Sequence, residues 1–141
     1  MYNAICHLNY VAVIVVTIIG FLFGWLWYSP LLFGKAWRTE MKISDEQMKE
    51  CAQKGMGKFL IKGFIYTLLG TFGLAVLISG HRSPGALKGA ELGLFVGALI
   101  VGVRMLNSGV WEQRSCRLQA ISIGHEILLF TLQSAIFGVW R

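Results

Sequence analysis

The side chains of this sequence that are best suited to chemistry are polar groups placed inside long apolar segments. Glu126 lies about 12 Å inside the segment that begins near residue 118, and Gln119, Ser122 and Gln133 share its helical face at offsets of four and seven residues. His125 adjoins it and points about 100° away. Because a charge at the centre of a bilayer costs about 2.5–3.5 kcal/mol even on lenient scales, we expect this stripe to face other helices. Such a carboxylate can bind a substrate or proton, or it can only fix the helix register.

Depth along the helices suggests partners for these groups. Arg104 and Lys62 begin about 3–5 Å inside the same boundary, so we expect an ionic cluster of Glu126 with Arg104, and with Lys62 as a second candidate. Both cations are also able to snorkel to the interface. Glu91 lies near the level of Gln133, which predicts a second polar contact in the other half of the membrane.

No catalytic or metal-binding pattern accompanies these groups. The sequence lacks HExxH, GxSxG and phosphate-loop motifs, and its three cysteines are widely spaced. We therefore predict no metal and no cofactor. An enzyme is the third choice of function, and it would bring Arg104, Glu112 and Arg114 together in one pocket at the loop side.

The composition indicates the elements that must hold these side chains. The chain has 141 residues, 55% hydrophobic and 14% charged, with a mean hydropathy of +0.62. One soluble domain of this size could not bury so much apolar surface, so lipid is the expected solvent. The net charge of +6 does not indicate nucleic-acid binding, because the cations lie between apolar segments and form no basic stripe with stacking aromatics.

The predicted fold is an all-α integral membrane protein: a four-helix transmembrane bundle with an interfacial amphipathic helix between spans 1 and 2. The spans are expected at about 8–28, 59–79, 86–106 and 118–140, and the first is expected to be retained as an anchor. Ser44 and Gln47 form a capping-box pattern, which predicts a loop helix over about 45–56. Eight loop cations on one side against three on the other place both termini outside the cytoplasm.

Glycines in two spans are spaced for close helix packing. Residues four apart share a helix face, and small ones let a neighbouring backbone approach. The pattern leaves open whether the packing lies within one chain or between copies. The glycines are Gly20 and Gly24 in the first span, and Gly85, Gly89, Gly93 and Gly97 in the third.

The stretch "GWLWYSPLLFGKAW" (24–37) crowds aromatic rings around a proline. Aromatic rings are favoured at headgroup depth, and the proline breaks the helical ladder, so we interpret the stretch as an interfacial elbow. An aromatic box that holds a ligand is the alternative. The motif residues are Trp27, Tyr28, Ser29, Phe33, Gly34, Lys35 and Trp37.

Three stretches resemble the bacterial family called domain of unknown function 1761. They are "LNYVAVIVVTIIGFLFGWLWYSPLLFGKAW", "VWEQRSCRLQAISIGHEILLF", which includes Glu112 and Arg114, and "AIFGVW". The resemblance covers nearly the whole chain and implies a small four-span protein of the bacterial inner membrane, without an assigned activity. This chain has His125 where the family commonly has an aromatic residue, so a role for Glu126 would be particular to it.

The leading functional hypothesis is an assembly role in the membrane, as a homo-oligomer or as an accessory subunit of a complex. It predicts a fully paired interior with Glu126 touching Arg104 or Lys62. The alternative is a small proton- or ion-coupled transporter or channel that uses Glu126, and it predicts water access to that carboxylate.

Overall fold

The computed structural model describes residues 5–6, 8–53, 55–80 and 85–140, and within them the secondary structure is helical. Four long apolar helices are able to cross a membrane, and short helices connect the first two, which confirms the predicted fold class. The third long helix is continuous through α6, a π-helical segment and α7. The elements are α2 (Tyr10–Trp27), α3 (Gly34–Glu40), α4 (Asp45–Gln53), α5 (Met56–Ser79), α6 (Ala86–Phe95), η1 (Val96–Gly102), α7 (Val103–Trp111) and α8 (Cys116–Val139).

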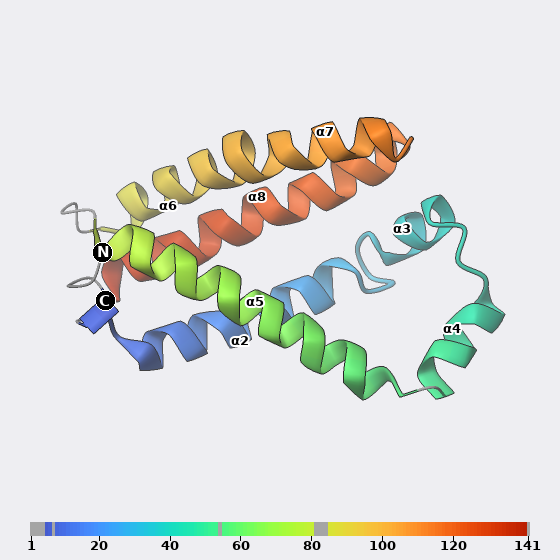
Figure 1. The fold of residues 1–141 in the computed structure, drawn as a ribbon, viewed down its shortest axis with the longest axis horizontal. Helices are drawn as coiled ribbons and strands as arrows, with labels where there is room; N and C mark the ends of the chain where they lie inside the picture. Colours follow the sequence, from blue (N-terminus) through green and yellow to red (C-terminus); the bar gives the residue numbers. More distant parts are fainter. Residues whose placement is uncertain (1–4, 7, 54, 81–84, 141) are drawn as a thin grey trace.

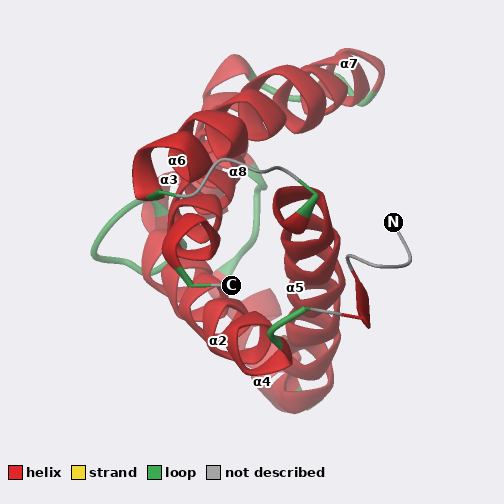
Figure 2. Ribbon diagram, turned by 90° about the vertical axis from the view of Figure 1, so that its left-hand side faces the viewer, coloured by secondary structure: helices red, strands yellow, loops and turns green. Residues whose placement is uncertain are grey.

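The long helices pack as two pairs. The α6–α7 helix runs beside α8, and α2 crosses α5 (Figure 1). The view from the end that holds the start of α2 and the end of α8 shows the helices nearly end-on (Figure 2). The short helices α3 and α4 lie at the opposite end.

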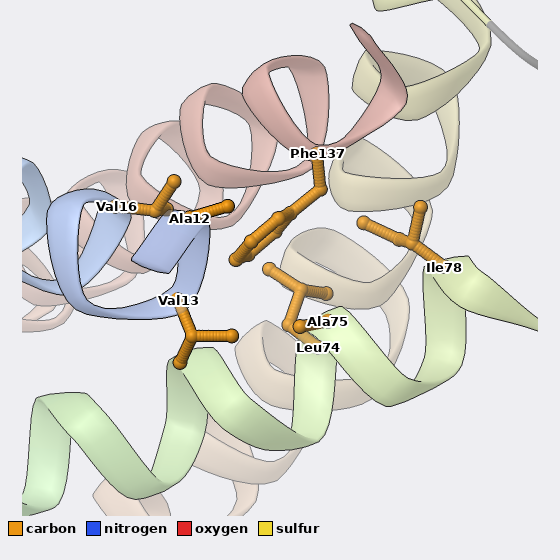
Figure 3. Close-up of a cluster of buried hydrophobic side chains, with 7 residues drawn as sticks. All are labelled: Ala12, Val13, Val16, Leu74, Ala75, Ile78 and Phe137. Carbon is orange, nitrogen blue, oxygen red and sulfur yellow. The ribbon is translucent and has the colours of Figure 1, made fainter. Parts of the chain in front are cut away.

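A cluster of buried apolar side chains joins α2, α5 and α8 near the end where α2 begins (Figure 3). Large apolar side chains on the outer faces stay exposed, as expected where lipid is the solvent. Because lipid is as apolar as these side chains, close van der Waals contact and not exclusion from water must hold the cluster together. Its members are Ala12, Val13, Val16, Leu74, Ala75, Ile78 and Phe137.

The glycines of α6 are used inside the chain. A Cβ at Gly89 would overlap the carbonyl oxygen of Ser134, and one at Gly93 would overlap that of Phe130. One at Gly97 would lie 2.9 Å from the Cα atom of Ile127. Gly89, Gly93 and Gly97 therefore let the third long helix lie directly on α8 within the chain, whereas a Cβ at Gly85, which was also predicted to pack, would meet nothing within 4 Å.

The π-helical segment coincides with a change in the glycine spacing. Successive ladder glycines are four residues apart up to Gly97, and the next is Gly102, five residues on. A π-turn adds one residue per turn, so this step keeps Gly102 packed beside Ile123 of α8, whose Cγ2 would be 3.2 Å from an added Cβ. The third helix extends to Trp111, five residues beyond the predicted end of the span at 106.

The loop between α2 and α5 contains one predicted helix and one that was missed. The helix α4 begins at Asp45, and the capping box is present: the Ser44 backbone N–H donates to the Gln47 side chain (2.9 Å), and the Gln47 N–H donates to Ser44 Oγ (3.2 Å). It ends at Gln53, short of the predicted 56, and Gly55 then takes a left-handed conformation (φ 101°) that favours glycine. No pattern in the sequence predicted α3.

Candidate functional site

His125 and Glu126 form an ionisable pair inside the fourth long helix. The His125 Nδ1 atom lies 3.0 Å from a carboxylate oxygen of Glu126, and the two side chains are 10% and 27% exposed. The other ring nitrogen, Nε2, is buried and has no hydrogen-bond partner among the described residues. A buried polar nitrogen that lacks a partner is costly, so its position calls for a functional explanation.

His125 is more buried than Glu126 because the two side chains lie on different faces of α8. His125 shares the face that turns toward α2, and Gly24 on α2 makes room for it: a Cβ there would lie 3.2 Å from Nε2. Glu126 borders the face against the π-helical segment, where its carbonyl oxygen would be 3.3 Å from a Cβ at Gly97. The stripe of Glu126 was expected to face the other helices, but His125, on the neighbouring face, is the more buried of the two side chains.

Aromatic rings from the end of α2 enclose the imidazole. Phe23 stacks on it with ring centroids 5.6 Å apart and 21° between the planes, and the Tyr28 and Trp27 centroids lie 5.2 and 6.1 Å away. The Trp27 indole N–H donates to the Ile121 carbonyl oxygen of α8 (3.1 Å), and this bond fixes the ring against the helix. We call Phe23, Trp27 and Tyr28 the aromatic shell.

The turn after α2 explains the spacing of the aromatic motif. Ser29 Oγ donates to the Leu26 carbonyl oxygen (2.7 Å), and the Phe33 and Gly34 backbone N–H groups return to Trp27 and Ser29 at 3.1 and 2.9 Å. A Cβ at Gly34 would overlap the Tyr28 carbonyl oxygen, so only glycine fits there.

The turn brings two aromatic rings that follow it in the sequence, Phe33 and Trp37, into contact with the aromatic shell. Phe33 packs on Trp27 with centroids 4.4 Å apart, and Trp37 meets Tyr28 edge-on at 5.6 Å. Lys35 and Trp25 remain exposed. The chain thus turns at this motif, and Trp27 and Tyr28 pack on α8, whereas a location of the elbow at the membrane interface stays a prediction.

Gln133 forms a second buried polar contact, deeper in the bundle. Its side-chain amide donates to Thr71 Oγ1 of α5 (2.8 Å) and lies 3.5 Å from the Val16 carbonyl oxygen of α2. Gly20 provides the space, because a Cβ there would overlap this amide. The predicted partner, Glu91, is exposed on α6. Gln133 instead connects α8 to α5 and α2.

The predicted ionic cluster around Glu126 is also replaced. Among the described residues, no ion pair joins Glu126 to Arg104 or Lys62, which are both exposed. Arg104 instead lines an open groove with Glu112 and Arg114, and these two form an ion pair. The enzyme hypothesis required these three residues to lie together. No hydrogen bond between a nucleophile and a base is found among the described residues that line the groove.

The comparison with protein families decides the relationship. A family model with the description "Protein of unknown function (DUF1761)" matches residues 11–138. The chain belongs to the DUF1761 family. Comparisons with curated proteins and with solved structures found no match.

In this DUF1761 member, sequence reasoning missed two residues of the site. Phe23 stacks on His125, and Thr71 accepts from Gln133, yet both occur in apolar runs without a distinguishing pattern. The four-residue spacings Gly20–Gly24 and His125–Leu129–Gln133 were the available signal, since each glycine faces a polar residue of α8. No group of three metal-binding side chains is found in the described part of the DUF1761 chain.

Proposed function

We propose that this membrane protein carries a proton-binding site within the bilayer and moves protons across it, as a small transporter or channel, with His125 and Glu126 as the proton-carrying pair. The observation that supports it is the buried, unpartnered Nε2 of a histidine whose Nδ1 contacts a carboxylate. An ionisable pair at this depth is expensive, and such residues usually mark a proton or ion pathway.

The chemistry follows from the two ring nitrogens. A neutral imidazole that donates its Nδ1–H to the Glu126 carboxylate leaves the Nε2 lone pair free to accept a proton. The product is an imidazolium–carboxylate pair without net charge, which is easier to hold in a low dielectric than a lone carboxylate. The faces of the aromatic shell favour the cationic ring. Tyr28, a further titratable group, lies beside His125 with its ring centroid 5.2 Å from the imidazole.

The neighbouring backbone also supports a functional role. The π-helical segment Val96–Gly102 packs against Glu126 and Ile127, and π-turns inside long helices frequently occur at functional sites. A proton leaving the pair would pass beside the partly exposed Glu126 side chain.

Proton flux into proteoliposomes tests the proposal. The purified protein is reconstituted with an enclosed pH-sensitive dye, and a pH gradient is imposed. We expect flux above that of empty liposomes, and we expect Glu126→Gln and His125→Phe to reduce it to the empty-liposome level. Glu91→Gln removes the same charge from an exposed position on α6 and is the matched control. Absence of wild-type flux, or equal loss in the control, would refute the proposal.

An assembly role is the second candidate, and the outer face of α5 favours it. A Cβ at Gly70 would meet nothing within 4 Å, whereas the α6 glycines pack on α8. Gly70 lies one helix turn from exposed Tyr66, so a second copy or a subunit of a membrane complex could approach the α5 backbone closely. Gly70→Leu should lower the dimer fraction in cross-linking experiments if the contact exists.

The loop cations support an orientation in the bacterial inner membrane with both termini outside the cytoplasm. Fusion of a reporter that is active only in the periplasm to either terminus tests this orientation.

A further inference from the structure

The groove on the outer face of α7 has the charge and shape of a lipid-binding site. Arg104, Ser108 and Glu112 follow one another at four-residue intervals and share a helix face. The apolar side of the groove is formed by Ile100, Val101 and Met105. One end is thus polar and cationic, and the end deeper along the helix is apolar.

A sharp turn completes the cationic end. Gln113 takes a left-handed conformation (φ 52°), and the Arg114 backbone N–H donates to the Gly109 carbonyl oxygen (2.9 Å), as in a Schellman cap. The Gln119 amide donates to the Arg114 carbonyl oxygen (3.1 Å) and holds the turn against α8. This geometry returns Arg114 to the groove beside Arg104.

The charge balance leaves one cation for a ligand. Arg114 is paired with Glu112, whereas Arg104 has no ion pair among the residues that the structure describes. Arg104 lies about 10 Å before the end of α7 along the helix axis. A long cationic side chain at that depth is stabilised by an anion at the membrane interface.

We infer that this groove binds an anionic phospholipid, with the phosphate diester between Arg104 and Ser108 and an acyl chain over Ile100 and Met105. Guanidinium and hydroxyl groups both donate to phosphate oxygens. A free inorganic phosphate would leave the apolar side of the groove unused, so the lipid is the occupant that matches both halves. The inference is independent of proton binding at His125.

Native mass spectrometry of the purified protein with short-chain phosphatidylglycerol tests this inference, with phosphatidylcholine as the uncharged reference. Arg104→Gln should weaken phosphatidylglycerol binding about five-fold. Ser108→Glu should weaken it at least as much, because it places an anion in the groove without altering either arginine. The control, Lys62→Gln, removes an exposed cation from α5 outside this groove and should leave binding unchanged.

Three outcomes would overturn the inference. Equal loss in Lys62→Gln would mean that only overall charge attracts the lipid. Competition by inorganic phosphate at equal concentration would mean that the groove is a free-anion site. Retained binding in both groove variants, with their far-ultraviolet circular dichroism unchanged, would place the lipid elsewhere.

Discussion

Replacing Gly93 by alanine should destabilise the bundle at the close contact between α6 and α8. The new Cβ would lie 2.6 Å from Ser134 Oγ and 2.7 Å from Ser134 Cβ, and it would overlap the Phe130 carbonyl oxygen. Ordinary contacts between such atoms are about 3.5–4.0 Å, so α6 would have to move away from α8 by about 1 Å. Overpacking of this kind costs about 1–3 kcal/mol.

The matched control is Gly73→Ala on α5. Both substitutions gain the same helix propensity, about 1 kcal/mol, but a Cβ at Gly73 meets no atom within 4 Å. The difference between the two variants therefore isolates the packing cost, and it corresponds to a change of about 5- to 150-fold in the folding equilibrium.

The assay is unfolding in mixed micelles with an increasing fraction of sodium dodecyl sulfate. Tryptophan fluorescence and circular dichroism report the unfolding. Gly93→Ala should unfold at lower detergent fraction than Gly73→Ala. Equal stability of the two variants would refute close packing of α6 on α8. A loss that appears only at high protein concentration would show that the ladder packs between copies.

Two further substitutions test the elbow and the deeper polar contact. Gly34→Ala should cost about 1–3 kcal/mol and change the tryptophan emission, because its Cβ would overlap the Tyr28 carbonyl oxygen and displace the turn. Thr71→Val keeps the side-chain shape but removes the acceptor for Gln133, so it should cost about 1 kcal/mol in the same detergent titration.

Each of these variants has a matched control. Gly57→Ala, in α5, places a Cβ where nothing lies within 4 Å, so it should not lower stability and should leave the emission unchanged. Thr67→Val removes a hydroxyl that donates only within α5, to the Gly63 carbonyl oxygen, and it should cost less than Thr71→Val. If either control variant is as unstable as its test variant, the proposed contact does not contribute to stability.

The sequence predicted the elements of this fold well because their causes are local. Length and hydropathy determine a transmembrane helix. The capping box between Ser44 and Gln47, which spans only four residues, determines the start of α4. The helix α3 was missed because its seven residues have no side-chain cap and depend on the turn at Ser29 and Gly34.

Polar partners were predicted less well, because depth along a helix does not determine rotation about its axis. Arg104 and Glu126 were expected to pair from their depth, yet Arg104 lies on an outer face. Gln133 was expected to contact Glu91, but the crossing of α2 and α5 brings Thr71 to it instead.

By itself, the sequence determined a four-span helical membrane protein with close glycine packing and a costly polar stripe in its last span. Periodicity, length and composition contain that information. Only the tertiary structure decided that Gly89, Gly93 and Gly97 pack within the chain, that His125 is enclosed by the aromatic shell, and that Glu126 pairs with it. Those contacts depend on how two helices far apart in sequence are rotated and placed against each other, which no local pattern specifies.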